Sequence, residues 1–179
     1  GVPAVVKPSE YTSFLTEVVV RDIIASKILP EGALQLLVGL GRGIIDHVDS
    51  RDTVTFTGSA TTGTILKAHS RIISQSVAFN LEADSLNATV LGLHARPGTA
   101  EFDLFIKETF KEITVKAGQK CTAIRRIIVP QDFIDEVQKG ISARLESTKI
   151  GDPSIEGVRM GALATRLQVE RVRASVETL

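Results

Sequence analysis

The sequence predicts an α/β protein built on an open parallel sheet. Short β-branched runs alternate with stretches of helical spacing, and turn residues separate them. The chain is 43% hydrophobic but only 4% aromatic, so its core consists mainly of Val, Ile, Leu and Ala. Strand–helix alternation builds parallel sheets through right-handed crossovers, and aliphatic strands suit a sheet that helices cover.

The first part of the chain contains three strand–helix pairs. Apolar residues recur at helical spacing after Ser13, and Pro30 and Gly32 end that pattern. We expect buried strands at 3–6, 34–38 and 53–57, and helices at about 13–28, 44–48 and 60–69.

From about residue 73 the spacing of apolar residues changes from the helical pattern to a period of two residues. Phe79 and Leu81 share one parity while Asn80 and Glu82 share the other, which predicts a strand with one apolar and one polar face. Further along we expect a strand at 86–91, a helix capped by Thr99, a buried strand after residue 121, a helix at about 131–147 and a last helix from about 162.

Cys121 is the only cysteine among the 179 residues, and it precedes the β-branched run 123–129. Four cations lie close to it in sequence: Lys116, Lys120, Arg125 and Arg126. Positive charge favours the thiolate, which is the nucleophilic form of cysteine. The alternative is an inert core thiol, because free cysteine is among the most buried residue types.

Glu82 lies at the end of the polar strand face and precedes Cys121 by 39 residues. A thiol that forms a thioester with an aldehyde carbon needs a base to activate the thiol or the hydrolytic water. Asp84 competes for this role, but an aspartate in such a position more often forms a turn. Glu82 is therefore the candidate base.

Two glycine-rich stretches, 39–43 and 56–59, lie where a strand gives way to a helix. Such junctions present backbone N–H groups and a positive helix end to an anion. The alternative is ordinary turn chemistry. Lys7 directly follows the first strand, where it could reach a ribose or a phosphate. The candidate anion-binding residues in the two stretches are Gly39, Gly41, Phe56, Thr57, Gly58 and Ser59.

Composition and spacing exclude several classes of function. Lys and Arg balance Asp and Glu at 21 each, which gives no extended surface for nucleic acid or an anionic membrane. The three histidines lack ligand spacing, so we expect no metal site. No apolar run reaches spanning length, and a single cysteine suits a reducing compartment. We expect a soluble, cytoplasmic protein.

Four stretches together resemble motifs of the aldehyde dehydrogenase superfamily, in the same order and over essentially the whole chain. They are Val-Lys-Pro-Ser-Glu at 6–10, Val-Thr-Phe-Thr-Gly-Ser at 54–59, Ala-Gly-Gln-Lys-Cys-Thr-Ala at 117–123 and Met-Gly-Ala-Leu at 160–163. The resemblance implies a partial Rossmann-like aldehyde dehydrogenase fold. The second half of the NAD(P)-binding domain would occupy 1–82, and the first part of the catalytic domain 83–179. It also adds Ser9 and Glu10 to Lys7 as ribose-side residues.

The motif of the general base departs from the usual pattern. The family motif begins Glu-Leu-Gly-Gly-Lys, and a gapless alignment puts Asn80 at its glutamate. Asparagine cannot act as a base. The block from Glu82 to Asn87 is similar to a narrower group, the aldehyde dehydrogenases of phenylacetate and benzoyl-CoA degradation, in which the glutamate of this block is the base. We therefore assign the role to Glu82, with Cys121 as nucleophile.

The resemblance implies oxidation of a CoA-linked semialdehyde to the acid through a thiohemiacetal and a thioester on Cys121, with NADP or NAD. Glu10 keeps both coenzymes open, because a carboxylate near the ribose repels a phosphate there. A rival interpretation is a non-catalytic nucleotide-binding or assembly module of the same fold, which would need neither Cys121 nor Glu82.

The first and last residues of the sequence suggest that it is part of a longer protein. It begins with Gly1 rather than methionine and closes inside a predicted helix. We expect a segment of a longer homo-oligomeric protein, with a fused hydratase-like domain as an option. Alone, the segment should expose strand edges and lack turnover.

Overall fold

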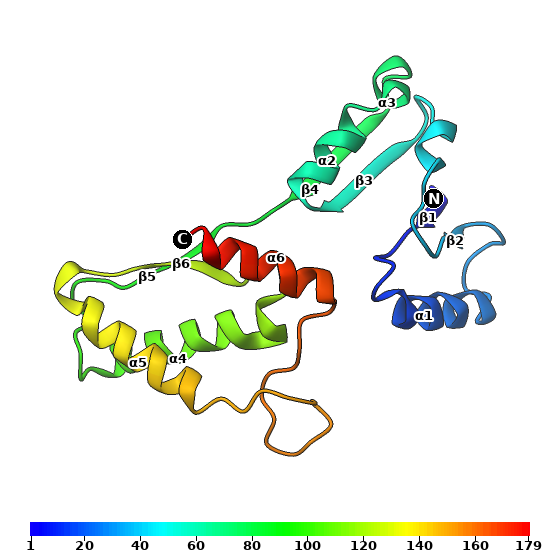
Figure 1. Ribbon diagram of the computed structural model, residues 1–179. Helices are drawn as coiled ribbons and strands as arrows, with labels where there is room; N and C mark the ends of the chain where they lie inside the picture. The colour runs from blue at the N-terminus through cyan, green and yellow to red at the C-terminus, as the bar shows by residue number, and fades with distance from the viewer. The chain divides into compact units, whose positions relative to one another are not determined.

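The computed structural model describes residues 1–179, which form two compact units, Gly1–Ala83 and Asp84–Leu179 (Figure 1). Each unit combines helices with parallel strands, so the predicted α/β class is confirmed. The strands pair two by two, β1 with β2, β3 with β4 and β5 with β6, and do not join into one continuous sheet.

The first strand pair of unit 1 consists of β1 (Ala4–Val6) and β2 (Leu34–Leu36), which pair in parallel across the intervening α1 (Ser13–Ala25). Helix α1 ends earlier than predicted, and Lys27 beyond it has a left-handed φ of 56°. Strand β2 also ends before the predicted residue 38. A 3₁₀ turn, η1 (Ile44–His47), takes the place of the expected short helix.

The second strand pair of unit 1 consists of β3 (Thr53–Gly58) and β4 (Ala78–Ala83). Between them, α2 (Ala60–Lys67) confirms the helix predicted at about 60–69. The structure adds a second helix that was not predicted, α3 (Ser70–Ser74), which is capped by His69 Nδ1 accepting a hydrogen bond from Arg71 N at 3.2 Å. Residue 73 is therefore helical. Along β4 the predicted alternation holds, because Phe79 and Leu81 are half-buried while Asn80 and Glu82 are exposed.

Unit 2 is built from one parallel strand pair and three helices. Its elements are β5 (Asn87–Val90), α4 (Ala100–Thr114), η2 (Val115–Gly118), β6 (Ile124–Ile128), η3 (Gln131–Phe133), α5 (Ile134–Glu146) and α6 (Arg166–Glu177). Thr99 caps α4 as predicted, with its Oγ1 accepting from Phe102 N at 3.3 Å. The last helix begins later than predicted, because Thr165 Oγ1 accepts from Gln168 N at 3.1 Å and sets the first turn there.

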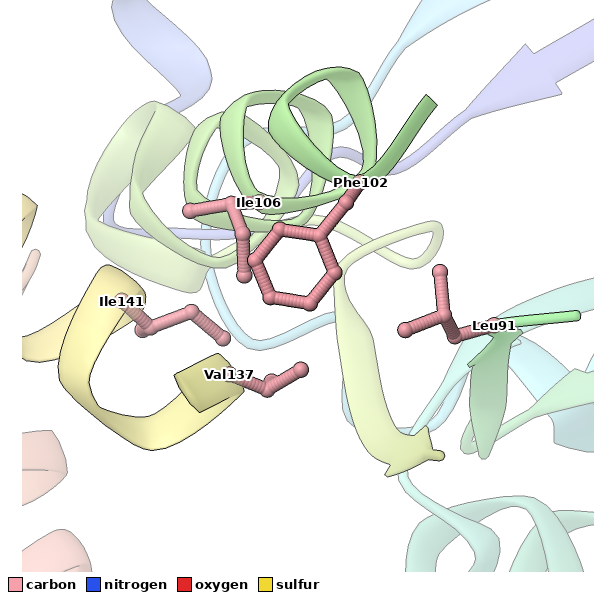
Figure 2. Close-up of a cluster of buried hydrophobic side chains, with 5 residues drawn as sticks. All are labelled: Leu91, Phe102, Ile106, Val137 and Ile141. Carbon is pink, nitrogen blue, oxygen red and sulfur yellow. The ribbon is translucent and has the colours of Figure 1, made fainter. Parts of the chain in front are cut away.

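The core of unit 2 lies between α4, α5 and the end of β5 (Figure 2). It consists of Leu91, Phe102, Ile106, Val137 and Ile141. Gly140 lets α5 approach α4, since a Cβ there would meet Ile106 carbons at 3.3 Å. This packing supports the pair of strands β5 and β6, and the loop that carries Cys121 leads into β6.

The strands are more exposed than their sequences predict. Val5 in β1 is 52% exposed, Val90 in β5 is 67% exposed and Ile128 in β6 is 51% exposed. The predicted burial of these strands is therefore wrong for this chain, and apolar side chains line open strand edges. None of the helices combines the length and apolarity needed to cross a bilayer.

Candidate functional site

Cys121 lies on the turn between η2 and β6, and its residue is exposed. The predicted loop-to-strand position is what the structure shows, with β6 beginning at Ile124. Cys121 is therefore not a buried core residue, while its role as nucleophile stays a prediction. An exposed thiol at a strand entrance is accessible to an electrophile.

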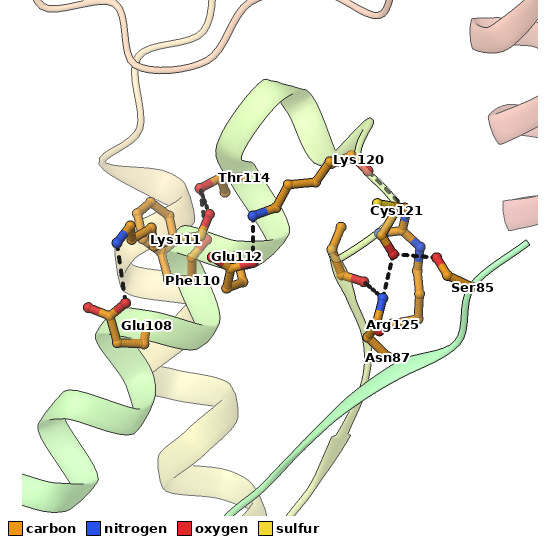
Figure 3. A network of polar contacts seen from close by, with 12 residues as sticks. Ser85, Asn87, Glu108, Phe110, Lys111, Glu112, Thr114, Lys120, Cys121 and Arg125 are labelled. Atoms are coloured by element: carbon orange, nitrogen blue, oxygen red, sulfur yellow. Dashed lines mark hydrogen bonds and ion pairs between the residues drawn. The ribbon is translucent and has the colours of Figure 1, made fainter. Parts of the chain in front are cut away.

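Two side chains from the start of β5 hold the main chain at Cys121 (Figure 3). The Cys121 carbonyl accepts hydrogen bonds from Ser85 Oγ and from Asn87 Nδ2, the latter at 2.5 Å. Asn87 Nδ2 also lies 3.4 Å from the carbonyl of Ala123, a fully buried residue. A carbonyl oxygen has two lone pairs, so both acceptor positions of Cys121 are used and its peptide plane is fixed.

Sequence reasoning missed Ser85 and Asn87. Their signal is weak, because two polar residues of the same parity at the start of a strand are common at any sheet edge. Only the parallel pairing of β5 with β6 places them opposite the turn that carries the thiol.

The loop that leads to Cys121 has an unusual backbone. Lys116 and Ala117 have φ values of 55° and 54°, and Gly118 follows at 71°. A left-handed conformation costs an L-residue roughly 1–2 kcal/mol, so neighbouring contacts must hold this segment. Glycine suits the third position, because a Cβ on Gly118 would lie 3.1 Å from the carbonyl oxygen of Ile113.

Two of the four cations near Cys121 in sequence are bound to other groups. Lys120 Nζ lies 2.5 Å from Glu112 Oε2, and Arg125 Nη2 donates to the Gly118 carbonyl at 2.9 Å (Figure 3). Their demonstrated role is to tie the loop to α4 and to β6. This revises the expectation that all four cations serve the thiol.

A polar cluster follows the ends of β1 and β2 in unit 1. Lys7 Nζ donates to the carbonyls of Pro8 and Gly39 at 2.7 and 2.9 Å, and it lies 3.4 Å from Glu10 Oε2. Gly41 faces the lysine stem, since a Cβ there would come within 2.6 Å of Lys7 Cδ. The structure thus brings together four of the predicted cofactor-binding residues: Lys7 and Glu10 from the ribose side, and Gly39 and Gly41 from the first glycine-rich stretch.

The charge state of Glu10 follows from this arrangement. A hydrogen bond from its own backbone N–H is the largest influence holding the pKa of Glu10 below its usual value, and the Lys7 ammonium adds to it. Glu10 is therefore an ionised hydrogen-bond acceptor at neutral pH. Ser9 lies in the same turn, where its carbonyl accepts from Thr12 N at 3.2 Å.

The predicted phosphate-side residues lie at the end of β3. The Phe56 ring packs over Gly58, where a Cβ would come within 2.5 Å of it. Ser59 caps α2, with its Oγ accepting from Thr62 N at 3.2 Å. Across the strand pair, Thr57 is the register partner of Glu82, so the candidate base lies beside this turn in unit 1.

Asp84 has a left-handed φ of 48° immediately after β4. That conformation fits a turn-forming aspartate better than a base. No cluster of three or more His, Cys, Asp or Glu side chains in the structure could hold a metal ion.

Unit 1 has polar side chains beyond the carboxyl ends of parallel strands, where α/β proteins bind ligands, and unit 2 has an exposed thiol at the start of a strand. The aldehyde dehydrogenase family model matches residues 1–179, and the chain belongs to this family. The resemblance predicted from the four motifs is confirmed at that level.

Two curated relatives show which members of the family the chain is similar to in sequence. The chain is 45% identical over 168 residues to 3,4-dehydroadipyl-CoA semialdehyde dehydrogenase from Aromatoleum evansii, covering 94% of this chain and 33% of that relative. It is 28% identical over 176 residues to 3-succinoylsemialdehyde-pyridine dehydrogenase from a Pseudomonas species, covering 97% of this chain and 35% of that relative. The chain thus spans about a third of the length of these relatives.

Solved structures share the fold. Betaine aldehyde dehydrogenase from Staphylococcus aureus in complex with NAD+ superposes with a TM-score of 0.84 at 22% identity, over 98% of this chain and 34% of that one. Succinate-semialdehyde dehydrogenase from Burkholderia pseudomallei gives 0.80 at 22% identity, over 96% of this chain and 35% of that one. These likenesses establish the fold alone.

Proposed function

We propose that the chain is the core of a longer, cytoplasmic NAD(P)-dependent aldehyde dehydrogenase. It oxidises a CoA-linked semialdehyde to the acid during degradation of phenylacetate, benzoate or a similar aromatic compound. The observation that carries this proposal is the 45% identity to a CoA-semialdehyde dehydrogenase over a segment that includes Cys121. Residues 1–82 contribute to the coenzyme domain and 83–179 to the nucleophile-bearing domain.

Cys121 and Glu82 divide the chemistry. The Cys121 thiolate attacks the aldehyde carbon and forms a thiohemiacetal. A bound NAD or NADP would accept the hydride from that carbon, which leaves a thioester on Cys121. Glu82 then takes a proton from water, the hydroxide adds to the thioester carbonyl, and the acid departs as the thiol is regenerated. Cys121 and Glu82 belong to different units, so their joint role is proposed from the chemistry that each residue can perform.

The contacts around Cys121 support its role. Ser85 and Asn87 fix its carbonyl, so the peptide that carries the thiol does not need to be ordered when the aldehyde arrives. Holding a nucleophile in place before reaction lowers the entropic part of the barrier.

The cluster after β1 fits the ribose of a dinucleotide. Glu10 offers an ionised acceptor for ribose hydroxyls, and Lys7 places an ammonium charge beside it that the Gly39 carbonyl holds. Both lie beyond the carboxyl ends of parallel strands, where α/β proteins bind nucleotides. The glycine at 41 keeps a side chain out of the space beside Lys7.

Glu10 should set the coenzyme preference. In Glu10→Gln the amide no longer repels a ribose phosphate, so the ratio of kcat/KM for NADP to that for NAD should rise about tenfold. Steady-state kinetics with both coenzymes measures the ratio, and Glu31→Gln, in an exposed turn, is the matched control. An unchanged ratio in Glu10→Gln would remove the carboxylate from the ribose site.

The proposed substrate class is tested with the full-length protein. Coenzyme reduction is followed with a CoA-linked aliphatic semialdehyde, with the same semialdehyde lacking CoA, and with betaine aldehyde. We expect kcat/KM at least about a hundredfold higher for the CoA-linked compound, because contacts to the remote carrier contribute to transition-state binding. Equal values for all three would refute the substrate class, and coenzyme binding without reduction of any would favour the non-catalytic module.

Further properties follow the same proposal. The full-length protein is expected to be a homo-oligomer. Residues 1–179 alone should not turn over, because they span about a third of the relatives' length.

A further inference from the structure

The segment from Met160 to Ala164 has no role in the chemistry above, yet it contacts the loop that carries Cys121. Two hydrogen-bond contacts join the segment to the loop, and both involve the side chain of Gln119. Its Oε1 accepts from Ala164 N at 2.8 Å, and its Nε2 lies 3.5 Å from the Ala162 carbonyl. Nε2 also donates to the Lys116 carbonyl at 3.0 Å, within the left-handed turn itself.

The geometry of these contacts is that of a strand pairing. In a parallel ladder, one residue binds the carbonyl before and the N–H after its neighbour. The Gln119 amide does the same to the backbone on either side of Leu163. A side-chain amide therefore takes the place of a peptide group, and both hydrogen-bond contacts between the loop and this segment come from Gln119.

The segment is a fixed support. At its start Gly151 N donates to the Met160 carbonyl at 3.0 Å, and Ile150 and Met160 form a parallel bridge. At its end Thr165 caps α6. Ala117 also lines an apolar cavity of about 410 Å³ together with Met160 and Ala162, so the loop and the segment border the same space.

We propose that Gln119 is a positioning residue for the nucleophile: its amide locks the left-handed turn 116–118 against residues 162–164 and so fixes the place of the Cys121 thiol. The left-handed Lys116 and Ala117 are unfavourable alone, so the turn needs an external restraint. Gln119 is two residues from Cys121, and misplacement of a reacting group by about 1 Å can cost about a hundredfold in rate. This inference rests on the proposed role of Cys121 as nucleophile.

The test compares Gln119→Glu with the wild type in the full-length protein as pH is lowered. At neutral pH the carboxylate has no proton to donate and faces the Lys116 and Ala162 carbonyls, so the turn should loosen. When protonated it regains one donor while keeping the acceptor for Ala164 N. The readout is the acylation rate of Cys121 by p-nitrophenyl acetate, with the acylated peptide identified by mass spectrometry.

We expect Gln119→Glu to acylate about tenfold more slowly than the wild type at about pH 8, and the deficit to shrink toward about pH 5 as the carboxyl is protonated. Gln119→Ala should show the deficit at every pH. Gln138→Glu, an exposed position on α5, should match the wild type throughout. KM for the coenzyme should stay the same in all variants, because none of these residues lies in unit 1.

Three results would overturn the inference. The first is a wild-type acylation rate in Gln119→Glu at all pH values, and the second is a deficit that does not depend on pH. The third is loss of cooperative unfolding in both Gln119 variants, which would make Gln119 a requirement for folding. A wild-type protein that does not acylate at Cys121 would refute the nucleophile instead. In that case the rate of Cys121 alkylation by iodoacetamide is compared between Gln119→Glu and the wild type across the same pH range. A pH-dependent difference would support the positioning role of Gln119, and its absence would refute it.

Discussion

Replacing Cys121 with serine should reduce aldehyde oxidation by more than about a thousandfold, because a neutral hydroxyl is a far weaker nucleophile than a thiolate. Coenzyme affinity, measured by fluorescence titration, should stay within about twofold, since Cys121 lies outside the unit that carries the ribose-side cluster.

The matched control is Thr122→Ser, an exposed neighbour in the same turn that should leave the rate unchanged. Turnover near that of the wild type in Cys121→Ser would contradict the covalent mechanism. Loss of both turnover and coenzyme binding would point to damage of the fold, and thermal unfolding of both variants distinguishes these cases.

Replacing Glu82 with glutamine should separate the two halves of the reaction. Thiol attack and hydride transfer proceed, but hydrolysis loses its base, so coenzyme reduction should show a burst of about one equivalent followed by turnover about a hundredfold slower. Rapid mixing with a CoA-linked semialdehyde measures the burst.

Asn80 provides the control for this assignment, because it lies on the same exposed strand face two residues earlier. Asn80→Ala should retain most activity. If Asn80→Ala stalls the enzyme while Glu82→Gln does not, the gapless alignment is right and the base lies elsewhere.

Much of the fold was predictable because it depends on local patterns. The strand at 53–58, the alternation of Phe79 and Leu81 with Asn80 and Glu82, and the cap at Thr99 follow from side-chain period and capping chemistry. The errors came where a single residue overrides the pattern. His69 caps a further helix, α3, directly after the predicted one and where the sequence pattern from about residue 73 indicates a strand.

The burial of the strands was not predictable from their composition. A β-branched run such as 124–128 indicates a strand that can be covered, but coverage depends on which other elements are present. In this chain β6 pairs on one side with β5, and Ile127 and Ile128 remain partly exposed.

The site was predictable where chemistry resides in one residue type. Cys121 could be proposed from its residue type and its neighbours, whereas Glu10 could be assigned only through the resemblance of residues 6–10 to a family motif. The positioning contacts were not predictable, because Asn87 and Gln119 act through backbone groups more than 30 positions away in sequence. Only the fold brings those groups within hydrogen-bond distance.

The central claim is that Cys121 carries the acyl group of a CoA-linked semialdehyde. The most direct measurement is the mass of the peptide containing Cys121, after Glu82→Gln is mixed with substrate and coenzyme and quenched in acid during the slow phase. We expect a stoichiometric mass increase equal to the acyl group, lost after hydroxylamine treatment and absent from Cys121→Ser. An unmodified Cys121 peptide, or the same acyl mass on another residue, would contradict it.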